Sequence, residues 1–226
     1  MIENKRRKYH HNIECVPTGF ANGSALDRPL NDEEKKQMIE EAAEHFGKFL
    51  DALKCDWRND PNSMETPHRI AKKYVLEQWA GRYNDPPSIT SFPSDSYQGM
   101  VLECNIPLIS MCSHHHENIL GRVHIAYIPG NDARVIGLSK LNRLVEHFGR
   151  RGAIQEQLTM AIHNAIDKIC EGNVGVMVMV KATHNCVSCR GVKHQGASMM
   201  TSEVSGVFAD HTKTAKMEVL EMIKMG

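Results

Sequence analysis

The fold class is decided by one alternating stretch, Gly121-Arg122-Val123-His124-Ile125-Ala126-Tyr127-Ile128-Pro129. Every second residue from Val123 to Tyr127 falls on one face of an extended chain, and the residues between them fall on the other. The spacing therefore predicts a β-strand over 121–129.

Two amphipathic helices are expected after this strand. Ser139 is placed to cap the first, in which apolar residues recur with helical spacing up to Phe148. The second has its apolar face over 158–169 and ends near Gly172. The elements expected next are strands at 174–181 and 198–208 and a terminal helix at 215–225. This order of strands and helices predicts an α+β fold.

The chain before residue 97 is expected to be helical. Asn31 and Glu34 form a candidate capping box for an amphipathic helix that continues to Leu53. A second helix is expected from about 67 to 80, with Thr66 as its N-cap, Pro67 in its first turn and Gly81 at its end. Residues 1–30 lack periodicity. The sequence thus predicts a flexible arm over 1–30, a helical region over 31–96 and a separate domain over 97–226.

Composition narrows the possible partners and the compartment. The 226 residues include 27 basic and 27 acidic side chains, so no overall field attracts nucleic acid or an anionic membrane. Neither a signal-peptide core nor a long apolar run is present, so we expect a cytoplasmic protein without membrane or nucleic-acid partners. The seven cysteines are scattered and odd in number, which favours free thiols or metal ligands over a disulfide framework.

Two short motifs carry most of the chemistry. They are Cys112-Ser113-His114-His115-His116 and Thr183-His184-Asn185-Cys186-Val187-Ser188-Cys189-Arg190. A thiolate and an imidazole three residues apart, as in Cys112 and His115, can close on one small cation. With a third ligand from the second motif the site would stay open for water, whereas both Cys186 and Cys189 would close it as a structural site. Spacing alone leaves both possibilities open.

The motifs of residues 112–141 resemble those of the GTP cyclohydrolase I family. Besides Cys112-Ser113-His114-His115 and the strand at 121–129, they include Val135-Ile136-Gly137-Leu138-Ser139-Lys140-Leu141. The resemblance continues through Gln155-Glu156, Ala182-Thr183-His184-Asn185-Cys186, Arg190-Gly191-Val192 and Thr201-Ser202, and spans roughly residues 64–224. Because several independent motifs recur in order, the match is highly specific.

The resemblance implies a Zn²⁺ site held by Cys112, His115 and Cys186, with Cys189 as a buried bystander. Zinc-bound water would open the imidazole ring of GTP, giving formate and 7,8-dihydroneopterin triphosphate. His114 and His184 would deliver protons, with His184 serving N7 of the purine, and Ser139 would assist later proton shifts.

Substrate-binding residues follow from the same resemblance. Glu156, helped by Gln155, would grip the guanidine-like edge of the purine. The cations that match the family's triphosphate contacts are Lys140, Arg143, Arg190 and Arg69.

The resemblance also implies the architecture. We expect a tunnelling fold over 97–226, with an antiparallel four-stranded sheet, two helices on one face and an N-terminal helical extension. The family's usual assembly is a homodecamer with active sites between subunits.

Some positions depart from the family pattern. Ser113 stands where Glu is usual, and His116-Glu117-Asn118 replaces two apolar residues and a proline. Gly152 and Gln157 stand where a bulkier apolar residue and an arginine are usual. Two alternative functions follow: a 7-deazaguanine nitrile reductase, which would not need zinc, and a paralogue that retains zinc for structure. The intact ligand set argues against the first alternative, and His114 with His184 argues against the second.

Overall fold

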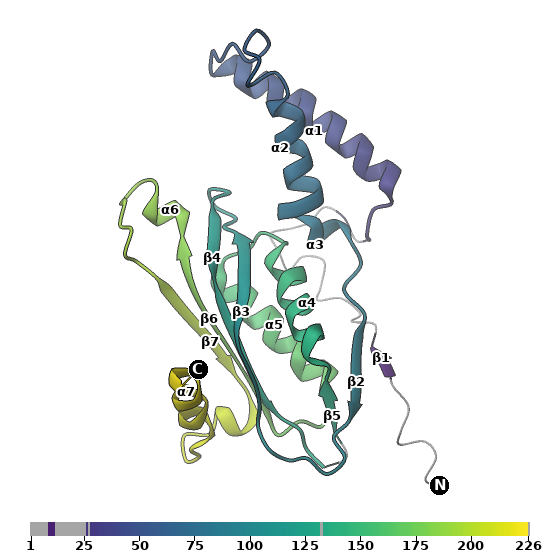
Figure 1. The fold of residues 1–226 in the computed structure, drawn as a ribbon, viewed down its shortest axis with the longest axis vertical. Helices are drawn as coiled ribbons and strands as arrows, with labels where there is room; N and C mark the ends of the chain where they lie inside the picture. Colours follow the sequence, from purple (N-terminus) through teal and green to yellow (C-terminus); the bar gives the residue numbers. More distant parts are fainter. Residues whose placement is uncertain (1–8, 12–25, 27, 132, 226) are drawn as a thin grey trace.

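A four-stranded antiparallel sheet forms the centre of the protein (Figure 1). The computed structural model describes residues 9–11, 26, 28–131 and 133–225. The strands lie in the order β3 (Val101–Met111), β4 (Asn118–Ile128), β6 (Gly175–His184) and β7 (Met199–Val204). The strand predicted at 121–129 is β4, which begins three residues earlier and ends one residue earlier.

Two helices cover one face of this sheet, as expected. They are α4 (Leu138–Gly149) and α5 (Gln155–Ile169) (Figure 1). Val123, Ile125 and Tyr127 of β4 are buried in the core that these helices complete. Ala126 belongs to a smaller cluster on the opposite face, which also contains Val219 of α7 (Ala215–Met225). The alternation predicted from the sequence, the α+β class and the paired helices are thus confirmed.

Strand β3 was not predicted, because its alternation is interrupted. The pairing with β4 shifts between Glu103 and Ile106, and Asn105 adopts a positive φ of 59°. This β-bulge changes which residues face the core. Pro107 follows directly, at a position that an edge strand tolerates.

A second sheet has three short antiparallel strands in the order β1-β2-β5. They are β1 (Tyr9–His11), β2 (Ile89–Pro93) and β5 (Arg134–Ile136). β2 falls inside the range 31–96 that the sequence predicts to be helical. The flexible arm predicted for residues 1–30 lies mostly outside the described residues.

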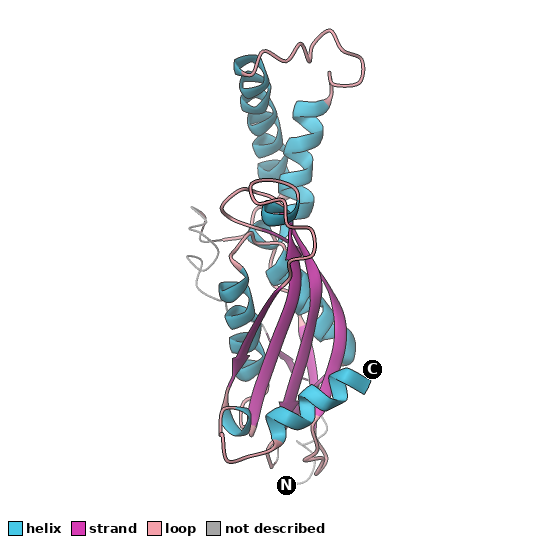
Figure 2. Cartoon of the chain, turned by 90° about the vertical axis from the view of Figure 1, so that its left-hand side faces the viewer, coloured by secondary structure: helices cyan, strands magenta, loops and turns pink. Residues whose placement is uncertain are grey.

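The N-terminal helices project beyond one end of the large sheet, and the C-terminal helix crosses near its other end (Figure 2). α1 (Asp32–Ala52) begins with the predicted capping box: Glu34 N donates to Asn31 Oδ1 at 2.9 Å, and Asn31 N donates to Glu34 Oε2 at 2.8 Å. None of the helices that the structure describes combines the length and apolar character needed to cross a membrane.

The second predicted helix is divided into three. α2 (Thr66–Lys72) leads into a π-helix, η2 (Lys73–Gln78), and then into α3 (Ala80–Tyr83). The N-cap is Glu65 and not Thr66. Gly81 lies inside α3, so it does not end the helix; a Cβ there would lie 2.1 Å from the carbonyl oxygen of His147. Close packing against α4 explains this glycine.

Helix α4 also starts differently from the prediction. Its N-cap is Gly137, and no side chain caps it, so the expected capping by Ser139 is wrong. The remaining elements are α6 (Asn185–Ser188), directly after β6, and the 3₁₀ turn η3 (Gly206–Phe208), which follows β7 and lies beside the start of β6.

Candidate metal and catalytic site

Three segments meet at one end of the large sheet. Met111, the last residue of β3, pairs with Asn118, the first residue of β4. Ile119 of β4 pairs with His184, where β6 ends. The antiparallel register therefore brings the segment after β3 next to the segment after β6, although these two segments are about seventy residues apart in the sequence.

Three side chains from these segments form a group that can hold a metal ion. The ligand atoms of Cys112, His115 and Cys186 all lie within 4.8 Å of one another. Cys112 is buried, Cys186 is partly buried and His115 is exposed. Cys189 lies outside this group, and its side chain is exposed. The expectation that Cys189 is buried is therefore wrong.

The ligand loop, defined here as residues 112–117, is a tight turn. Cys112 N donates to Glu117 O at 2.8 Å, and His116 N donates to Cys112 O at 2.9 Å. His116 has a positive φ of 53°, which non-glycine residues seldom adopt. The turn places Cys112 and His115 on one side of the loop, where Cys186 completes the group.

The Cys186 thiol lies close to the Cys112 thiol. Burial raises the pKa of Cys186, and the nearby Cys112 raises that pKa further, while the charge of Arg190 lowers it. A soft or borderline cation bound by both sulfur atoms would stabilise the Cys186 thiolate.

His184 is held by a buried amide. Its Nε2 lies 2.8 Å from Oε1 of Gln155, which is 1% exposed. Nε2 of Gln155 donates to three acceptors at 3.1–3.2 Å: the carbonyl oxygens of Val180 and Met199 and the hydroxyl of Thr201. Since the amide N–H groups are used in this way, Oε1 accepts from His184 Nε2–H, and Nδ1 is the free nitrogen of the neutral ring. This role of Gln155 was not predicted.

Charged side chains adjoin this end of the sheet. Burial lowers the pKa of His184, and the carboxylate of Glu156, in the first turn of α5, opposes that shift. The His114 ring lies edge-on to that of His115, with centroids 6.3 Å apart. The structure thus brings Gln155, Glu156, His114 and Arg190 close to the ligand group or to His184.

Ser139, Lys140 and Arg143 are not brought there. Near the start of α4, Asn142 donates to Glu103, which lies near the start of β3. At the end of α4, a Cβ on Gly149 would lie 3.0 Å from the carbonyl oxygen of Ile109, which lies near the end of β3. Helix α4 therefore runs along β3, and its N-terminus lies far from Cys112. The strand from Glu103 to Cys112 spans about 25–30 Å. Arg69 is exposed on α2. Within the described residues, no ion pair engages Lys140, Arg143, Arg190 or Arg69.

Comparisons with known proteins agree with these features. A family model described as GTP cyclohydrolase I matches residues 42–224. The Haemophilus ducreyi protein named GTP cyclohydrolase 1 is 41% identical over 193 residues, covering 84% of this chain and 86% of its own. The protein of that name from Mycobacterium avium is 42% identical over 160 residues, which are 70% of this chain and 77% of that protein. The one from Geobacillus kaustophilus is 42% identical over 169 residues, which are 73% of this chain and 88% of that protein. A solved archaeosine synthase QueF-Like overlaps 47% of this chain and 93% of its own at 17% identity, with a TM-score of 0.37, which adds nothing further.

Proposed function

The chain belongs to the GTP cyclohydrolase I family and is an enzyme of that type, and we propose that Cys112, His115 and Cys186 hold the Zn²⁺ with which it hydrolyses GTP. The products would be 7,8-dihydroneopterin triphosphate and formate. The observation that carries this proposal is the cluster of two thiols and one imidazole within 4.8 Å.

The donor set fits zinc. Thiolate and imidazole are the ligands that Zn²⁺ prefers, and three protein ligands are typical of catalytic sites, which keep one position open. Bound there, zinc would activate a water molecule as nucleophile and act as a Lewis acid.

The histidines would handle protons beside this group. Because Gln155 accepts from Nε2 of His184, Nδ1 is the atom of His184 that can take up a proton from water and, from the imidazolium so formed, pass it to N7 of the purine. His114, exposed on the ligand loop, would serve the ribose ring oxygen. Glu156, in the first turn of α5, would accept two N–H bonds from the guanidine-like edge of the purine, and a charged acceptor strengthens such bonds. Gln155 can help to bind the purine only if its side chain can make a hydrogen bond in addition to those with His184, Val180, Met199 and Thr201.

The triphosphate would be bound by Lys140, Arg143, Arg190 and Arg69, with Ser139 assisting the later proton shifts. Since Lys140, Arg143 and Ser139 lie at the opposite end of β3 from Cys112, one chain cannot direct them at a substrate held by its own ligand group. We therefore propose a homo-oligomer, a decamer by the family resemblance, in which neighbouring subunits supply the two halves of each site. A cytoplasmic location is part of the proposal, supported by described cysteines that are all free.

The test measures metal and products together. The protein is purified without chelator, zinc per subunit is quantified, and formate release and pteridine absorbance are followed with GTP. We expect about one zinc per subunit and both products in the wild type, and loss of zinc and of both products in Cys186→Ser. Cys189→Ser is the matched control, because Cys189 is exposed and outside the group; it should behave as wild type.

Other outcomes would favour the alternatives. Stoichiometric zinc without formate would indicate a paralogue that retains the metal for structure. Wild-type activity in Cys186→Ser would refute the ligand set.

A further inference from the structure

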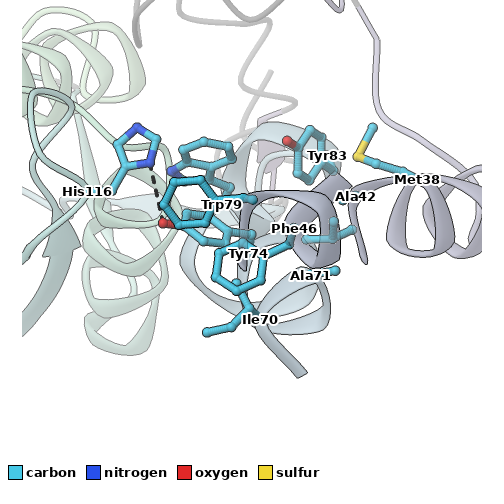
Figure 3. Close-up of a pocket in the computed structure, with 11 residues that line it drawn as sticks. Met38, Ala42, Phe46, Ile70, Ala71, Tyr74, Trp79, Tyr83 and His116 are labelled. Atoms are coloured by element: carbon cyan, nitrogen blue, oxygen red, sulfur yellow. Dashed lines mark hydrogen bonds between the residues drawn. The ribbon is translucent and has the colours of Figure 1, made fainter. Parts of the chain in front are cut away.

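The π-helix η2 touches the ligand loop, where Tyr74 meets His116 (Figure 3), and it also touches the first residue of β4. The Tyr74 hydroxyl lies 3.4 Å from Nδ1 of His116. Four residues later, Gln78 Nε2 donates to Asn118 Oδ1 at 3.0 Å. These two contacts bracket the stretch between His116 and Asn118, directly after the candidate ligand His115.

The segment that makes both contacts has a π-helical backbone. Trp79 N donates to Tyr74 O at 2.9 Å, a bond that skips five residues where an α-helix skips four. The extra residue in the turn changes which side chains share a face, and such segments occur frequently at functional sites. Tyr74 and Gln78 lie four residues apart on this segment, and both contact residues at or next to the ligand loop.

Trp79 completes the contact. Its ring lies edge-on to the rings of Tyr74 and His116, with centroids 4.8 Å and 5.1 Å away. Figure 3 shows these three rings together at one end of an apolar cavity of about 410 Å³ between α1 and α2. Arg82 stacks 4.6 Å from the Trp79 ring and donates to the carbonyl oxygens of Arg151 and Gly152, which ties Trp79 to the start of the segment before α5.

His115 needs such support more than the other ligands do. Cys112 is buried at the end of β3, and Cys186 is partly buried in α6, but His115 is exposed. The backbone of His115 lies between Cys112 and His116, which are joined by the hydrogen bond from His116 N to Cys112 O. Groups that hold a metal ligand's surroundings commonly change metal affinity when they are removed.

We propose that Tyr74, Gln78 and Trp79 are positioning residues for the metal site, which hold the ligand loop so that His115 stays within reach of Cys112 and Cys186. This proposal rests on the proposed metal site. The three residues contact His116 and Asn118 and act on His115 through them.

The test compares two substitutions on the same π-helix. Gln78→Met removes the hydrogen bond to Asn118 and keeps the side-chain length, and Glu77→Met places the same residue at an exposed neighbouring position. Zinc release into a chromogenic chelator is timed, and the visible spectrum of the Co²⁺-substituted protein reports ligand geometry. We expect Gln78→Met and His116→Ala to release zinc about 10–100-fold faster than wild type and to shift the Co²⁺ bands, while Glu77→Met does neither.

Thermal unfolding separates this role from a structural one. Oε1 of Gln78 is buried without a hydrogen-bond partner among the described residues, so Met at this position should cost little stability. Unchanged zinc release in Gln78→Met and His116→Ala, whatever their unfolding temperatures, would overturn the proposal and leave the zinc site standing. A wild-type protein that binds no zinc would overturn both.

Discussion

At the scale of single residues, the pair of His184 and Gln155 shows how a buried amide can orient a reactive ring. Gln155 uses its N–H groups on the backbone of β6 and β7 and on Thr201, which leaves its oxygen for His184. An amide held this firmly cannot rotate to follow the ring, so the ring must follow the amide. The pair thereby links the sheet to the proposed proton transfer.

Gln155→Met should separate orientation from purine binding. Loss of the Gln155 hydrogen bond frees the His184 ring, and we expect kcat to fall about 10–100-fold with a smaller change in KM. The acceptors left behind should lower the free energy of unfolding by about 1–3 kcal/mol. Thr159→Val is the control, because the Thr159 hydroxyl bonds Gln155 O and Thr201 but not His184; its kcat should stay near wild type. A raised KM with unchanged kcat in Gln155→Met would instead make Gln155 a purine contact.

His147 makes folding sensitive to acid. Burial lowers the pKa of His147 from 6.5 to about 4, and the nearby Arg151 contributes to this. Between pH 6.5 and pH 4 the unfolded chain therefore binds a proton at His147 that the folded protein does not bind. The contribution of neutral His147 to the free energy of unfolding is fully present above pH 6.5 and is lost as the pH falls toward 4. By pH 5 the loss should be about 2 kcal/mol. In urea unfolding at pH 7 and pH 5, His147→Gln should lose about 2 kcal/mol less than wild type; equal losses would contradict the assignment.

At the scale of elements, what could be predicted depended on how regular the backbone is. β4 alternates without interruption and α1 carries a complete capping box, so local spacing was enough for both. β3 contains a bulge at Asn105, and the helix after Pro67 passes into a π-helix, so the period of each is broken where prediction failed. Such irregularities depend on contacts with distant segments, which spacing cannot reveal.

Three of the positions that depart from the family pattern, His116, Asn118 and Gly152, lie against the π-helix η2 or Trp79, which follows it. His116 and Asn118 contact Tyr74 and Gln78, and Gly152 adopts a positive φ of 65° where a Cβ would lie 2.7 Å from Nε1 of Trp79. The resemblance to the family implied the group of Cys112, His115 and Cys186, and the structure brings these three side chains together. The way in which residues 74–82 meet these positions required the fold, because the segments are far apart in sequence.

At the scale of the whole molecule, several surfaces suit contact with other copies of the chain. β3 and β7 are the edges of the large sheet, and long open edges invite pairing with another strand. Large apolar side chains are exposed on β3 and on the N-terminal helices, including Ile109 at 54%, Phe49 at 53% and Leu76 at 51%. These features support the proposed oligomer, in which the sheet edges and helices of neighbours would meet.

Shared active sites can be tested by mixing two inactive variants. Cys186→Ser removes a ligand from one half of the proposed site, and Lys140→Ala removes a triphosphate cation from the other half. Suppose that each site takes one half from each of two neighbouring subunits, and that equal amounts of the two variants are refolded together. Each half of a site then comes from either variant with equal chance, so about a quarter of the sites contain neither substitution, and about a quarter of wild-type activity should return. Each variant refolded alone is the control and should stay at its own low level. If both halves came from a single chain, every site in the mixture would carry one of the two substitutions, and the mixture would show only the average activity of the two variants.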